Sequence, residues 1–160
     1  MTPTTVERDA QFVIGLVTRT TNAAESTPAT ARLGRLWQRV LSEHVIERVP
    51  RPTDPTALHA VLTDYESDAR GEYTQVVGVV AAAPDQLPSG LVAVAIPAGR
   101  YMLFTAHGRM PDALITTWQT IWDYFAGRAP VERAYTTDYE VHRGSTNPEA
   151  SVVEVYVAIR

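Results

Sequence analysis

Apolar residues recur along this chain at two spacings, which alternate in a regular order from one end to the other. Runs rich in β-branched residues indicate strands, and apolar residues at every third or fourth position indicate helices over 29–45 and 110–126. Trp37 lies on the apolar stripe of the first helix and Trp118 on that of the second. Strands are predicted over 11–20, 58–65, 73–82, 91–96, 101–107, 134–142 and 151–159.

Prolines, glycines and polar clusters set the expected boundaries of these elements. Thr27 followed by Pro28 is typical of a helix start, with the threonine as the cap and the proline at the first helical position. Three prolines within 50–55 predict a loop, and Gly127 is expected to end the second helix. The polar residues 1–10 are expected to form a frayed lead-in.

The order strand–helix–strand–strand occurs twice, over 11–83 and over 90–160. The tetrapeptide Thr-Asp-Tyr-Glu also occurs twice, at 63–66 and at 137–140, each time on the first predicted strand after a helix. This echo favours an internal duplication within a single domain, residues 1–160. The predicted fold is therefore α+β: two tandem β-α-β-β units form one continuous antiparallel sheet, with both helices on one face and a groove between them.

Composition narrows the chemistry that this chain can perform. A net charge of −4 without a basic run argues against nucleic acid as a partner. All fourteen basic residues are arginine, so lysine chemistry is excluded, and the absence of cysteine excludes disulfides and thiolate nucleophiles. The N-terminus lacks the apolar core of a signal peptide, and the longest apolar runs are too short to span a bilayer. We therefore expect a cytoplasmic protein without a membrane partner.

Metal and cofactor sites are not expected from the sequence. The four histidines, His44, His59, His107 and His142, show no ligand-like spacing. No motif for nucleotide, dinucleotide or serine-hydrolase chemistry is present. A Glu140–His142 pair could serve general acid–base catalysis, but an exposed histidine at a strand end is the simpler interpretation.

The predicted strand 134–142 carries the polar residues that most need an explanation. Alternation places Asp138, Glu140 and His142 on one side of this strand and Tyr139 on the other. An enclosed carboxylate is costly unless it is paired with a donor or a cationic ligand, whereas an exposed one simply faces water. Spacing alone favours the exposed interpretation, because most strand carboxylates are solvated.

Several stretches, in their order and spacing, resemble the GyrI-like effector-binding domain family. This family includes the effector-binding domains of AraC- and MerR-type multidrug regulators and stand-alone, integron-associated effector-binding proteins. The resemblance covers roughly residues 12–160. The matching stretches are VIGLVTRTTN, LGRLWQRV, AVLTDYESDARGEYTQVVGVVA, IPAGRYMLFTAHG, TTWQTIWDYF, DYEVH and VVEVYVAI.

The resemblance implies a pocket that is lined by aromatic rings and binds lipophilic, often cationic, small molecules. The family usually has an Asp-Phe-Glu-x-Tyr stretch, whose acidic residue reaches toward the positive charge of the ligand. The matching stretch here has Tyr139 in place of the phenylalanine and His142 in place of the later tyrosine, and it keeps Glu140. We therefore expect a stand-alone protein that binds such molecules through Glu140, Trp37, Tyr65, Tyr73, Trp118, Tyr139 and His142.

Two other functions are open from the sequence. Some proteins of this fold resemble hydrolases that open strained rings of electrophilic natural products. In that case Glu140 would be the general base, and Tyr139, Tyr65 or a tryptophan would hold the substrate. Alternatively, the chain resembles gyrase-inhibitor-like proteins that act by binding a protein partner, although no residue points to such a partner.

Overall fold

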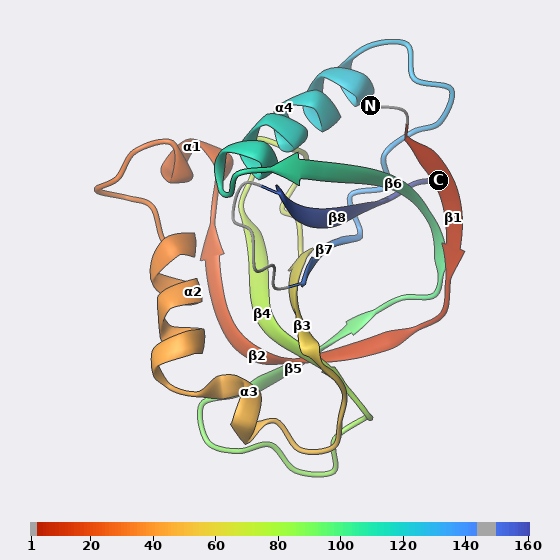
Figure 1. Cartoon of the computed structure of the whole chain (residues 1–160). Helices are drawn as coiled ribbons and strands as arrows, with labels where there is room; N and C mark the ends of the chain where they lie inside the picture. Colours follow the sequence, from red (N-terminus) through yellow and green to blue (C-terminus); the bar gives the residue numbers. More distant parts are fainter. Residues whose placement is uncertain (1–2, 144–149) are drawn as a thin grey trace.

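The computed structural model describes residues 3–143 and 150–160, in which eight strands form one antiparallel, strongly curved sheet (Figure 1). The two longest helices cover one face of this sheet (Figure 1). No helix in the described residues is long and apolar enough to cross a membrane. The elements, in chain order, are β1 (Thr4–Arg8), β2 (Gln11–Thr20), α1 (Asn22–Glu25), α2 (Leu33–Ser42), α3 (Val45–Arg48), β3 (Pro52–Thr63), β4 (Tyr73–Ala81), β5 (Val92–Ile96), β6 (Gly99–Gly108), α4 (Asp112–Ala126), β7 (Thr137–Arg143) and β8 (Ser151–Ala158).

Two runs of elements with the same order build most of this sheet. In the first, β2, α2, β3 and β4 place their strands in the spatial order β3-β4-β2. In the second, β6, α4, β7 and β8 place theirs in the order β6-β8-β7. The two halves join where β3 pairs with β7, with Ala60 opposite Glu140. The predicted α+β fold with one continuous antiparallel sheet is therefore confirmed, and β1 and β5 extend it at its two edges.

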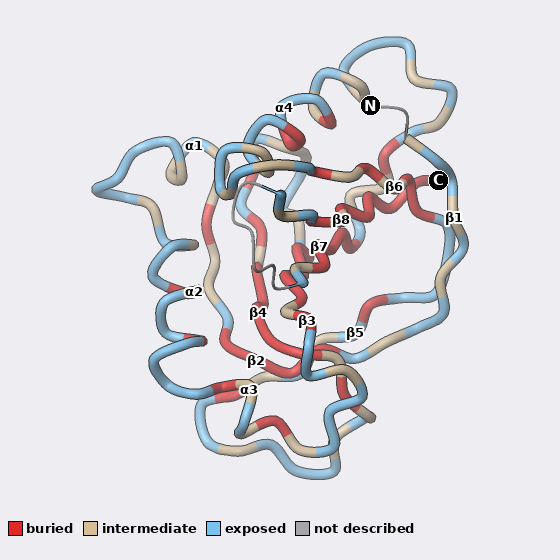
Figure 2. The backbone as a smooth tube through the Cα atoms, in the orientation of Figure 1, coloured by how far each residue is buried: buried red, intermediate tan, exposed pale blue. Residues whose placement is uncertain are grey.

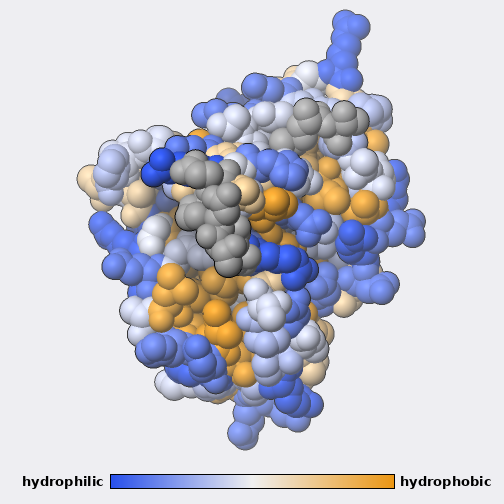
Figure 3. Space-filling model, in the orientation of Figure 1, coloured by the Kyte–Doolittle hydropathy of each residue, from blue (hydrophilic) through white to orange (hydrophobic). Residues whose placement is uncertain are grey.

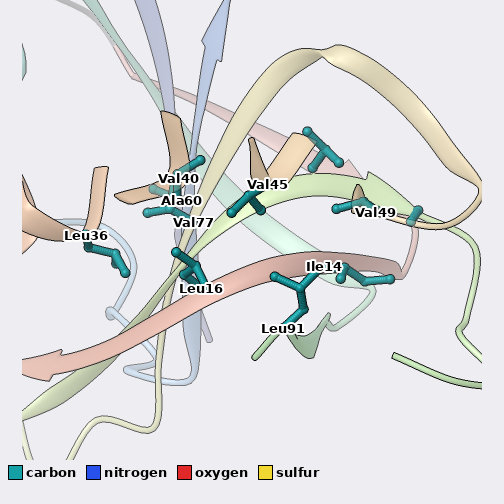
Figure 4. Packing of buried hydrophobic residues seen from close by; sticks show 11 residues of the cluster. Ile14, Leu16, Leu36, Val40, Val45, Val49, Ala60, Val77 and Leu91 are labelled. Atoms are coloured by element: carbon teal, nitrogen blue, oxygen red, sulfur yellow. The ribbon is translucent and has the colours of Figure 1, made fainter. Parts of the chain in front are cut away.

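Hydrophobic clusters fill both faces of the sheet. One cluster joins α2 and α3 to β2 and β4 and includes Leu36 and Val40 of α2 together with Leu16 (Figure 4). A second cluster joins α4 to β6 and β8 and includes Ile121 and Phe104. A third cluster lies on the opposite face of the sheet. Figure 2 shows that buried residues concentrate in the central strands. Because these strands are covered on both faces, their sequences are nearly continuous apolar runs.

Two predicted boundaries are wrong because strand pairing outweighs local composition. The frayed lead-in predicted over 1–10 is wrong for residues 4–8, since β1 forms there and pairs with β6 along its whole length, while residues 1–2 lie outside the described residues. The loop predicted over 50–55 is also wrong, since β3 already begins at Pro52. The pairing of β3 with β4 is irregular between Pro52 and His59, and this irregularity accommodates prolines, which have no N–H to donate.

The first long helix begins later than predicted. The predicted start at Pro28 is wrong, because α2 begins at Leu33. The carboxylate of Glu25, in α1, accepts hydrogen bonds from the backbone N–H groups of Arg32 (2.9 Å) and Leu33 (3.1 Å). These N–H groups have no partner within the helix, so an acid from the preceding segment takes the place of the expected threonine cap. The predicted helix also breaks near its end, where His44 has a left-handed backbone (φ 52°).

The two Thr-Asp-Tyr-Glu stretches occupy different places in the two halves. Thr63 is the last residue of β3, whereas Thr137 is the first residue of β7. The two threonines lie opposite each other, with their Oγ1 atoms 2.9 Å apart. The tetrapeptides therefore meet at one end of the β3–β7 pair and are not equivalent positions. The shared element order is then what supports the predicted duplication of 11–83 and 90–160.

Strands β2 and β4 come unusually close to each other at Gly15 and Gly78, which are directly opposite in the register. A Cβ atom on Gly78 would lie 1.9 Å from the carbonyl oxygen of Ile14, and one on Gly15 would lie 1.9 Å from that of Val77. Because both contacts are with backbone, no side-chain rotation can relieve them. The sheet requires glycine at both positions.

We predict that Gly78→Ala lowers the free energy of unfolding by about 3 kcal/mol, the upper end of what overpacking usually costs. The matched control is Gly34→Ala in α2, where an added Cβ meets nothing within 4 Å. This control should raise stability by roughly 0.5–1 kcal/mol, because alanine favours the helix. Urea denaturation of both variants measures the difference, and equal effects of the two substitutions would contradict the close strand approach.

Candidate functional site

The helix-covered face of β7 carries three polar side chains in a row, Asp138, Glu140 and His142. They share this face because alternate residues of a strand point the same way. On one side, Glu140 pairs with Ala60, which belongs to the cluster beneath α2. On the other side it pairs with Val155, which belongs to the cluster beneath α4. Glu140 therefore lies at the boundary between the two hydrophobic clusters, in the centre of the sheet.

Both carboxylate oxygens of Glu140, which is only 5% exposed, have hydrogen-bond partners. Its Oε2 accepts a hydrogen bond from the indole Nε1 of Trp118 in α4, at 2.7 Å. Its Oε1 lies 2.7 Å from Nε2 of His142. The imidazole ring of His142 in turn lies against the indole of Trp37 in α2, with 4.6 Å between the ring centroids. One tryptophan from each helix is thus connected to the carboxylate, directly or through His142.

Asp138 is completely buried and is held by a different set of groups. Its Oδ2 accepts hydrogen bonds from Nη2 of Arg133 at 2.8 Å and from the hydroxyl of Tyr65 at 2.5 Å. Its Oδ1 accepts a hydrogen bond from the backbone N–H of Ala158 at 2.7 Å. A buried carboxylate requires such partners, and here an arginine supplies the compensating charge. Sequence reasoning missed Arg133, because it precedes β7 in an irregular segment that shows no periodicity.

Two tyrosines extend the aromatic surface beside Asp138. The rings of Tyr65 and Tyr73 lie 5.9 Å apart, centroid to centroid. Burial raises the pKa of the Tyr65 hydroxyl well above its usual value, and the charge of Asp138 raises it further. Burial also raises the pKa of Tyr73, as do the charges of Glu25 and Glu140. Both hydroxyls are therefore neutral at physiological pH and can act as hydrogen-bond donors.

Six of the seven residues expected from the sequence to bind a ligand lie on the helix-covered side of the sheet, and one does not. Tyr139 points to the opposite face, where its ring stacks on that of Tyr156 with centroids 4.5 Å apart. Strand alternation separates it from Glu140, so the two side chains do not share a groove. The six on the helix-covered side are Glu140, His142, Trp37, Trp118, Tyr65 and Tyr73.

A separate cavity of about 330 Å³ opens on the face to which Tyr139 points. Its lining includes Tyr139 and Tyr156, together with the charged residues Arg8, Asp54, Arg143 and Glu154. Nη1 of Arg143 lies 3.3 Å from Oδ2 of Asp54, and the guanidinium of Arg8 lies 5.1 Å from the ring centroid of Tyr156. Arg143 and Asp54 thus offset each other's charge within the lining of this cavity.

Comparison with known proteins identifies the family. The sequence profile of the integron-associated effector binding proteins matches residues 4–159. The chain belongs to this family. The match extends from β1 to the end of β8 and so includes both halves of the sheet. Membership in an effector-binding family supports small-molecule binding as the general function.

Individual relatives agree in fold over nearly the whole chain. An integron cassette protein of Vibrio cholerae is 32% identical, with a TM-score of 0.77 over 99% of this chain and 95% of that one. A Bacillus subtilis (strain 168) protein named as a transcriptional regulator, YobU, is 28% identical over 154 residues, which cover 95% of this chain and 94% of that protein. A structure of a protein bound to tetraphenylphosphonium has a TM-score of 0.80 over 100% of this chain and 94% of that one; at 17% identity it shows the same fold.

On the opposite face of the sheet, burial gives His59 a pH-dependent effect on stability. Burial lowers the pKa of this imidazole from 6.5 to about 4. The unfolded chain therefore takes up a proton at a higher pH than the folded chain, and stability is lost as the pH falls below about 6.5. Between pH 7 and pH 5, this residue alone should lower the free energy of unfolding by about 2 kcal/mol.

Urea denaturation at pH 7 and pH 5 tests this effect of His59 with two variants. In His59→Phe, which keeps a ring next to Tyr139, the loss of stability between the two pH values should be smaller than in the wild type by about 2 kcal/mol. The exposed His107 provides the control, and His107→Gln should keep the wild-type pH dependence. If both variants kept that dependence, protonation of His59 would not be its cause.

Proposed function

We propose that lipophilic, positively charged small molecules bind between α2 and α4, next to Glu140, in a site that we call the groove, and that the protein senses or sequesters them. The observation that carries this proposal is the environment of Glu140. Its carboxylate is nearly inaccessible to solvent, and among the described residues no arginine pairs with it; the basic side chain within hydrogen-bond distance is that of His142. Trp118 touches it from α4, and Trp37 packs on His142 from α2.

The physical argument is that such a carboxylate favours a cation. Hydrogen bonds from neutral groups satisfy the oxygens of a buried carboxylate but leave its net charge in place, and a ligand carrying positive charge would offset that charge. Indole and phenol rings add to this attraction, by about 0.5–2 kcal/mol for each cation placed over an aromatic face. Both oxygens of Glu140 already have hydrogen-bond partners, Trp118 at Oε2 and His142 at Oε1, which suits a fixed negative charge better than it suits a base that must activate water.

Relatives point to the same class of ligand. The family is named for effector binding. A protein of the same fold was solved in complex with tetraphenylphosphonium, a lipophilic cation whose phosphorus carries four phenyl groups. Hydrophobic atoms also reach the surface beside α2 and α3 (Figure 3), and Leu41 of α2 is 61% exposed. An apolar surface next to the groove would favour the approach of a lipophilic molecule.

We predict that tetraphenylphosphonium quenches the tryptophan fluorescence of the protein in a saturable manner, since Trp37 and Trp118 both lie next to the proposed site. Glu140→Gln should weaken this binding at least about tenfold, because it removes the charge while nearly preserving the shape. The matched control is Glu66→Gln, which neutralises an exposed glutamate outside the groove and should leave the affinity unchanged.

Two results would count against the proposal. If tetraphenylphosphonium and other lipophilic cations caused no saturable quenching, the groove would not be a cation site. If Glu140→Gln and Glu66→Gln weakened binding equally, the effect would arise from overall charge and not from the carboxylate in the groove.

A further inference from the structure

Arg133 already forms, within the protein, the type of interaction that we propose for the ligand. Its side chain is 4% exposed, and its guanidinium lies over three aromatic rings. The distances from Cζ to the ring centroids are 4.5 Å for Tyr135, 5.5 Å for Tyr65 and 5.7 Å for Trp118. The buried Nε atom has no hydrogen-bond partner among the described residues, so the rings account for much of its surroundings.

The charge of this guanidinium is held by Asp138. Nη2 of Arg133 lies 2.8 Å from Oδ2 of Asp138, and the Tyr65 hydroxyl interacts with both groups. Burial by itself lowers the pKa of Arg133, but the charge and hydrogen bond of Asp138, together with the neighbouring tyrosines, outweigh burial and raise it, so the arginine remains a cation. A cation, a carboxylate and an aromatic cage are thus already combined at one end of the polar row on β7.

The caged arginine is directly connected to the proposed ligand site. Trp118 lies under the guanidinium of Arg133 and also donates its indole N–H to Glu140. Asp138 and Glu140 are two residues apart on the same face of β7, which separates them by about 7 Å along the strand. The positive charge on Arg133 is therefore close enough to act on a cation that binds at Glu140.

We propose that Arg133 determines how many positive charges the groove accepts. Among the described residues of β7, two carboxylates face the helix-covered side, and Arg133 neutralises Asp138, which leaves Glu140 as the strand's anionic group for a ligand. The preferred ligand is then a lipophilic monocation. A dication would place its second charge next to the guanidinium and be repelled. This inference rests on the proposed function and specifies the class of ligand.

The effect of the charge of Arg133 on cation binding can be tested with four variants and one probe, tetraphenylphosphonium. Arg133→Gln leaves Asp138 unneutralised, so the monocation should bind about tenfold more tightly, a change of about 1.4 kcal/mol. Asp138→Asn leaves Arg133 unneutralised, so binding should weaken about tenfold. The double variant Arg133→Gln/Asp138→Asn removes both charges and should bind within about threefold of the wild type. Arg133→Lys keeps the positive charge and should also bind within about threefold of the wild type.

A matched pair of probes tests whether the protein discriminates between a monocation and a dication. 4-Methylbenzyltrimethylammonium and p-xylylene-bis(trimethylammonium) share one aromatic ring and differ by one quaternary ammonium group. The wild type should prefer the first, and Arg133→Gln should shift the affinity ratio toward the second by at least about tenfold. The double variant should show the wild-type ratio again. Affinities are measured by tryptophan quenching after circular dichroism has shown that each variant is folded.

The outcomes separate the inference from the proposed function. If the wild type binds no cation, the proposed function fails and the inference fails with it. If the wild type binds tetraphenylphosphonium but Asp138→Asn and the double variant bind it equally, the charge of Arg133 has no effect and only the inference is overturned. The comparison of Asp138→Asn with the double variant tests the inference even if Arg133→Gln does not fold.

Discussion

The pairing of β7 with β3 is the constraint on which the rest of the arrangement depends. It joins the two halves of the sheet, and its register places Glu140 opposite Ala60, between the clusters beneath α2 and α4. Because side chains alternate along a strand, a slip of one residue would turn Glu140 to the other face and bring Tyr139 to the helices. The hydrophobic residues of both strands resist that slip, since each would exchange its face of the sheet as well.

Two neighbouring carboxylates on β7 meet the cost of burial in different ways. Asp138 is neutralised internally by Arg133 and has no solvent exposure. Glu140 has a neutral indole donor and a histidine, and its nearest large neighbours are aromatic. The first arrangement is typical of a structural ion pair, and the second leaves a charge that a ligand can complement. Because a single residue separates Asp138 from Glu140, the charges around one carboxylate also act on the other.

Local sequence patterns predicted the elements well where each element depends on its own residues. The apolar stripe of α4 and its end at Gly127 follow from helical spacing and from the helix-breaking glycine. Errors arose where a distant partner supplies the stabilisation. The edge strand β1 exists because β6 offers it a ladder of hydrogen bonds, and α2 begins at Leu33 because Glu25 reaches its free N–H groups. Neither partner can be identified from the neighbouring residues.

The sequence by itself determined the α+β class, the order of the elements, and the separation of Glu140 from Tyr139 on the two sides of one strand, because these follow from spacing and alternation. Only the tertiary structure decided that Glu140 is buried beneath the helices with Trp118 as its donor. Only the tertiary structure showed that Arg133 lies among aromatic rings and pairs with Asp138. The physical reason is that burial and charge compensation depend on which distant segments meet, and periodicity carries no information about that.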